Sequence, residues 1–113
     1  MIVATVGCIV ANALIAIADY ARAPFVLANS AEVRLPPAAV PYLATLKLAG
    51  AAGLLIGLSG VHWLGLAAGI GLTAFFIGAV LAHVRARVFY NIAFPGGYLL
   101  LAVASTGFFV GKI

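Results

Sequence analysis

Three ionisable side chains, Asp19, Lys47 and His83, lie within or at the edge of long apolar segments. Hydrocarbon penalises charged groups, so an ionisable residue in such a segment is a candidate functional site. The histidine could pass a proton near neutral pH, and the lysine could polarise a carbonyl or quinone oxygen. The carboxylate could act as acid or base, or could hold the lysine in place. We therefore predict these three residues as the catalytic set.

The composition around them is that of a membrane protein. The chain has 113 residues, of which 66% are hydrophobic and only 7% are charged, and its mean hydropathy is +1.28. Soluble domains carry about 25% charged residues. Between Lys47 and Arg85 no residue has a fixed charge, and this stretch is too long for one membrane span but suits two. We expect a single domain over residues 1–113.

The fold class that we predict is an all-α membrane protein built as a four-transmembrane-helix bundle. About 20 apolar residues cross a bilayer, which places the spans at about residues 2–20, 40–58, 63–84 and 93–110. No Lys or Arg precedes the first apolar run, so we predict a retained span and not a signal peptide. Residues 23–40 are polar and proline-rich. We expect a loop there, with room for one short interfacial helix, that serves as a lid.

The distribution of basic residues predicts the orientation. With four spans in order, the arginines fall on one side: Arg22, Arg34, Arg85 and Arg87. Lys112 and His62 fall on the other side. The positive-inside rule then places both termini outside and loops 23–40 and 85–92 in the cytoplasm of a multi-pass cell-membrane protein. The net charge of +4 indicates contact with anionic lipid and not with nucleic acid.

The same topology brings the polar residues toward one leaflet. Asn12 and Asp19 are seven residues apart and share a helix face, while Lys47 lies roughly 9 Å into its span. We predict a ligand-binding set of Asn12, Glu32, Lys47, His83 and Arg85. A purely structural interpretation stays open, in which Asp19 and Lys47 form a salt bridge that fixes helix register. In that interpretation His83 hydrogen-bonds a helix-end carbonyl.

Several chemistries are not indicated. The sequence has no H-E-x-x-H motif, no clustered Cys and His, and no P-loop. The two histidines fall on opposite sides of the predicted membrane, so we expect no metal and no haem. Glycines four residues apart allow close helix approach, within the bundle or at a homo-oligomer face. These pairs are Gly53 with Gly57, Gly65 with Gly69, and Gly107 with Gly111.

Two stretches carry a resemblance to a known family. Residues 46–55, LKLAGAAGLL, are followed by LGLAA at residues 64–68, and residues 75–85 read FFIGAVLAHVR. These segments resemble the DoxX-like family, above all in the Leu-Lys pair and the Ala-x-His-x-Arg ending. The resemblance covers roughly residues 40–90 and implies a four-helix membrane bundle. It points to Lys47, His83 and Arg85 as site residues.

The family resemblance also bears on function. Relatives have been linked to quinone-coupled sulfur oxidation, redox-defence complexes and membrane-protein assembly. We expect a protein that holds a hydrophobic carbonyl-bearing or quinone-like molecule between its helices, with a quinone as candidate cofactor, as an accessory to a redox system. One alternative is a cofactor-free isomerase or epoxide-opening enzyme on a terpenoid or sterol-like substrate, with Asp19 and His83 as the acid–base pair. The other is a structural or assembly partner of a membrane complex.

Overall fold

The computed structural model describes residues 2–113, except for the side chain of Pro37. Helix α1 (Ile2–Tyr20) is followed by the nine-residue helix α2 (Pro24–Glu32) and a short 3-10 helix, η1 (Pro37–Ala39). Three long helices complete the chain: α3 (Val40–Leu58), α4 (His62–Arg85) and α5 (Ala93–Val110). The segment 23–40, expected to be mostly loop, thus contains a helix that begins at Pro24, where the missing N–H of proline costs nothing.

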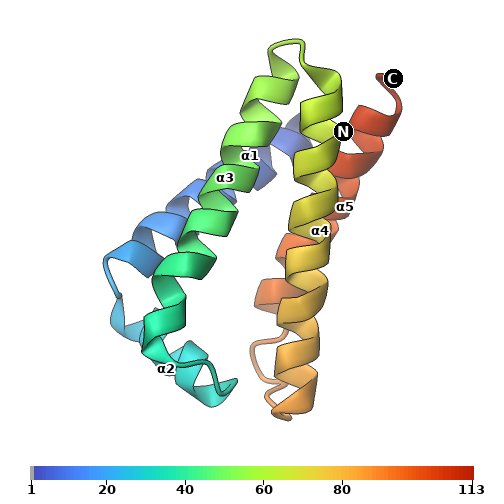
Figure 1. Ribbon diagram of the computed structural model, residues 1–113. Coiled ribbons are helices and arrows are strands. Elements are labelled where there is room, and N and C mark those ends of the chain that lie inside the picture. The colour runs from blue at the N-terminus through green and yellow to red at the C-terminus, as the bar shows by residue number, and fades with distance from the viewer. Residues whose placement is uncertain (1) are drawn as a thin grey trace.

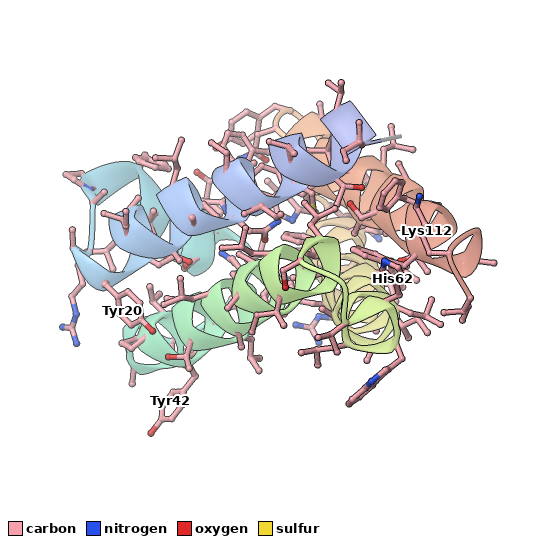
Figure 2. All side chains as sticks on the ribbon, turned by 90° about the horizontal axis from the view of Figure 1, so that it is seen from above. Tyr20, Tyr42, His62 and Lys112 are labelled. Carbon is pink, nitrogen blue, oxygen red and sulfur yellow. The ribbon has the colours of Figure 1, made fainter. Side chains whose placement is uncertain are left out.

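The four long helices form a closed ring. Helix α1 packs against α3 and α5, and α4 packs against the same two helices. Figure 1 shows both termini and the α3–α4 turn at one end of the bundle, and α2 with the α4–α5 connection at the other. In Figure 2, which is seen from above, Tyr20 and Tyr42 lie on the side of α2, away from His62 and Lys112. Tyr20 ends α1 and Tyr42 lies in the first turn of α3, so both are at the α2 end of the bundle. The predicted all-α four-helix bundle is confirmed.

The bundle has its apolar side chains outside and many of its polar side chains inside. In α1 the exposed face carries Val10, Leu14 and Ile17, whereas Asn12 and Asp19 are buried. All four long helices are long and apolar enough to cross a membrane. A soluble helix would show the opposite arrangement, because its apolar stripe faces the core. The fold is therefore that of a multispan membrane protein in a lipid bilayer.

Close helix contact near the α3–α4 turn depends on glycine. A Cβ added to Gly57 would lie 2.5 Å from the Cα of Gly65, and a Cβ added to Gly65 would lie 2.5 Å from the Phe109 ring. Phe109 is fully buried, so its ring has no space to retreat. Both glycines, together with Gly53 and Gly69, are buried and serve packing within this bundle.

Three helix ends carry an arginine in the left-handed backbone region. Arg22, Arg34 and Arg87 have φ values of 52°, 64° and 57° and follow α1, α2 and α4. Glycine is the usual residue at such ends, and an L-residue there costs roughly 1–2 kcal/mol. All three arginines lie in the segments at the α2 end of the bundle. Arginine supplies a charge at this end that glycine could not provide.

We predict that Gly65→Ala lowers the free energy of unfolding by about 1–3 kcal/mol, because the added methyl group has to displace the buried Phe109 ring. The matched control is Gly78→Ala on the same helix, where an added Cβ meets no atom within 4 Å. The control should be neutral or slightly stabilising. Thermal unfolding of both variants in one detergent, followed by circular dichroism, measures the difference. Equal losses in the two variants would contradict the close-packing account.

Candidate functional site

A cavity of about 370 Å³ lies at the α2 end, between α2 and the neighbouring parts of α1, α3, α4 and α5. Its polar lining comes from distant parts of the sequence: Asp19, Asn29, Ser30, Glu32, Lys47, His83, Tyr90 and Asn91. Its aromatic walls are Phe25, Phe75, Phe76 and Phe94. The volume falls within the roughly 300–1,000 Å³ of typical small-molecule sites.

An ion pair forms one wall of the cavity. Lys47 Nζ lies 2.7 Å from Asp19 Oδ2, and the two side chains are only 12% and 4% exposed. The ammonium also lies 5.6 Å from the centroid of the Phe75 ring, within cation–π range. The pair joins α1 to α3, as the structural interpretation of the sequence expected. Lysine has three N–H donors, so the ammonium keeps donors for a further partner in the cavity.

His83 lines the cavity and has one ring nitrogen without a hydrogen-bond partner among the described residues. The side chain is 4% exposed, and Nδ1 lies 3.0 Å from the carbonyl oxygen of Ala79. A carbonyl oxygen only accepts, so Nδ1 carries the proton of this hydrogen bond. Nε2 is buried and has no hydrogen-bond partner among the described protein atoms. A buried polar atom without a partner is costly, and this one belongs to a residue of the cavity lining.

Two side-chain contacts join α2 to the α4–α5 connection beside the cavity. The Tyr90 hydroxyl donates to the Glu32 carboxylate, at 2.6 Å from each oxygen, and Asn91 Nδ2 donates to Asn29 Oδ1 at 2.8 Å. The hydrogen bond to the carboxylate raises the pKa of the Tyr90 hydroxyl above its usual range, so Tyr90 remains a donor at neutral pH.

Sequence reasoning did not single out Asn29, Tyr90 or Asn91 for this site. They lie in connecting segments without regular spacing, and only the polarity around Asn29 hinted at a role.

Two predicted site residues are not brought to the cavity. Asn12 is fully buried on the inner face of α1, where its Nδ2 donates to the carbonyl of Cys8 at 2.9 Å, but it is not among the lining residues. Arg85 is the last residue of α4, is exposed, and also does not line the cavity. The structure gathers Asp19, Glu32, Lys47 and His83 from the predicted set.

The lining can therefore hold a molecule with a polar end and an apolar body. Lys47 offers donors, His83 has an unpaired ring nitrogen at Nε2, and the phenylalanine rings offer an apolar contact surface. Within residues 2–113 no three His, Cys, Asp or Glu side chains group in a way that could hold a metal ion.

Fold and site together define a small multispan membrane protein with a buried polar cluster beside a cavity. The sequence profile of the DoxX-like family matches residues 3–105, which is most of the chain. The protein belongs to the DoxX-like family. No curated protein and no solved structure matches the chain in such comparisons.

We predict that Lys47→Met alone destabilises the protein strongly, because it leaves the Asp19 charge buried without a partner. Breaking a buried pair in this way costs about 3–5 kcal/mol. Adding Asp19→Asn to Lys47→Met removes that charge and should recover much of the loss. Unfolding of the two single variants and the double variant in one detergent measures the coupling. Additive losses in the double variant would show that the pair contributes no coupling energy.

Proposed function

We propose that this DoxX-like membrane protein holds one hydrophobic molecule with a carbonyl or quinone-like oxygen in the cavity under α2. The observation that supports the proposal is that one cavity is lined by two polar side chains, from α3 and α4, whose hydrogen-bonding capacity is not fully used within the protein. Lys47 retains N–H donors that a carbonyl oxygen would accept, and His83 Nε2 lacks a protein partner. The four phenylalanines of the lining supply the surface for an apolar ring.

The arrangement favours binding over acid–base catalysis. Asp19 is paired with Lys47 at 2.7 Å, so its carboxylate is not free to exchange a proton with a substrate. An acid–base pair needs both groups free to exchange protons with a substrate. An assembly role alone would require neither a buried ion pair nor a cavity with unsatisfied polar atoms. The association with a redox system rests on the family resemblance.

We further propose that α2 acts as the lid of the cavity. Both partners of the Glu32–Tyr90 contact and of the Asn29–Asn91 contact line the cavity. Glu32 and Asn29 belong to α2, so moving α2 away from the cavity would break both contacts. Glu32 and Tyr90 are exposed, and exposed polar contacts contribute little stability. Such a lid can open without unfolding the four-helix ring.

We expect acetonaphthone, a naphthalene ring with one acetyl group, to bind the protein in lipid nanodiscs in a saturable manner. The Asp19→Asn, Lys47→Met double variant should bind it at least about tenfold more weakly, because a hydrogen bond from a charged donor is lost. Lys112→Met is the matched control, since Lys112 also lies over a phenylalanine ring, 5.3 Å from the centroid of Phe108, but at the opposite end. Fluorescence titration measures the dissociation constants. Binding that is equally strong in all three proteins would contradict the proposed function.

For orientation, we propose that both termini lie outside and that residues 23–40 and 85–92 face the cytoplasm. Ala31→Cys and Ser59→Cys test this in a Cys8→Ala background, since Ala31 and Ser59 are exposed and at opposite ends of the bundle. An impermeant thiol reagent added outside whole cells should label position 59 and spare position 31. The reverse labelling pattern would overturn the orientation.

A further inference from the structure

The unsatisfied polar atoms of the protein interior share one chemical property. Within residues 2–113, three buried side-chain atoms lack a hydrogen-bond partner: Asn12 Oδ1, His83 Nε2 and Asn91 Oδ1. The two amide oxygens can only accept hydrogen bonds. The third atom, His83 Nε2, is an acceptor in the neutral ring. All three unpaired atoms are therefore acceptors when the His83 ring is neutral.

For His83, the contact with Ala79 determines which nitrogen is free. Because Nδ1 donates to a carbonyl, the neutral ring carries its hydrogen on Nδ1 and a lone pair on Nε2. Turning the ring over would place carbon against the Ala79 carbonyl and lose that bond. His83 lines the cavity, and its Nε2 is itself buried, so a bound molecule reaches the lone pair once the side chains around the ring shift.

Asn91 provides a second acceptor in the same cavity lining. Its Nδ2 donates to Asn29 Oδ1, which leaves Oδ1 as the atom without a partner. Asn12 carries the third acceptor but does not line the cavity. Lys47 is the charged donor of the lining, so the lining residues carry donors on α3 and buried, unpaired acceptors on α4 and on the α4–α5 connection.

We infer that the bound molecule carries a hydroxyl group as well as a carbonyl oxygen, and that the hydroxyl donates to His83 Nε2. The ligand class is an apolar, ring-bearing hydroxy-carbonyl compound. Its carbonyl oxygen accepts from Lys47, and its ring packs against Phe75 and Phe76. A molecule with carbonyl groups alone would leave the His83 acceptor unpaired. The inference rests on the proposed function, because it assigns the second polar contact of the same ligand.

A pair of ligands that differ only in the donor tests this inference. Hydroxyacetonaphthone with the acetyl group on one naphthalene ring and the hydroxyl group on the other has no hydrogen bond between the two groups, and the matching methoxyacetonaphthone replaces the hydroxyl hydrogen by methyl. Both are titrated by fluorescence against the full-length protein in nanodiscs. Acetonaphthone, which lacks the substituent altogether, controls for the bulk of the methyl group. The hydroxyl compound should bind about tenfold more tightly than either comparator, as expected for one buried hydrogen bond.

A histidine variant locates the contact. In His83→Phe, which keeps a ring of similar shape but has no nitrogen acceptor, the advantage of the hydroxyl compound should vanish. His62→Gln, at the opposite end of the bundle, should keep it. Equal binding of the three compounds to the unaltered protein would overturn the hydroxyl inference and leave the carbonyl site standing. If none of the three compounds binds, both the inference and the proposed function fail.

Nuclear magnetic resonance of the His83 ring tests the same contact in a protein that keeps His83, so the result does not depend on whether a His83 variant folds. The chain has two histidines, so His62→Gln leaves His83 as the one imidazole to observe. With nitrogen-labelled histidine, the Nε2 resonance should shift when hydroxyacetonaphthone is added and should not shift with methoxyacetonaphthone. Identical shifts with both compounds would overturn the assignment of Nε2 as the hydroxyl acceptor.

Discussion

The ion pair between Lys47 and Asp19 is the constraint on which the α2 end of the molecule depends. Each charge alone would be costly at this depth in an apolar bundle, so the two must meet, and their meeting fixes α1 against α3. The contact with the Phe75 ring then ties the pair to α4. With three helices held in this way, their side chains form a cavity wall of fixed shape. The remaining N–H donors of Lys47 belong to that wall.

The remainder of the bundle shows how helices associate when lipid covers them. Apolar burial between helices gains little over contact with lipid, so close packing and internal hydrogen bonds have to hold the helices together. At the end away from α2, Gly57 and Gly65 let α3 and α4 approach, and Phe109 of α5 fills the remaining space. At the α2 end, the cavity lies between α2 and the four long helices.

The sequence predicted the features that follow from hydropathy and charge. Four apolar segments give the four-helix bundle, and the rarity of charges made Asp19, Lys47 and His83 stand out. Contacts between connecting segments could not be predicted, because Asn29 and Asn91 meet across 62 residues and no periodicity relates them. Arg85 lies at the same depth as the cluster but on the exposed side of α4. Its position in the sequence gives its depth along the helix and does not give which face of α4 is turned toward the bundle interior. The acceptor at His83 Nε2 becomes visible only once the partner of Nδ1 is known.

The most direct test of a ligand held by the polar cluster is to identify what the protein retains from its own membrane. The unaltered protein and the Asp19→Asn, Lys47→Met double variant are purified identically, and their organic extracts are compared by mass spectrometry. The account predicts one apolar, carbonyl-bearing molecule near equimolar amount in the unaltered protein, and its loss from a double variant of equal helix content. Extracts that match each other, with nothing enriched over bulk lipid, would contradict it.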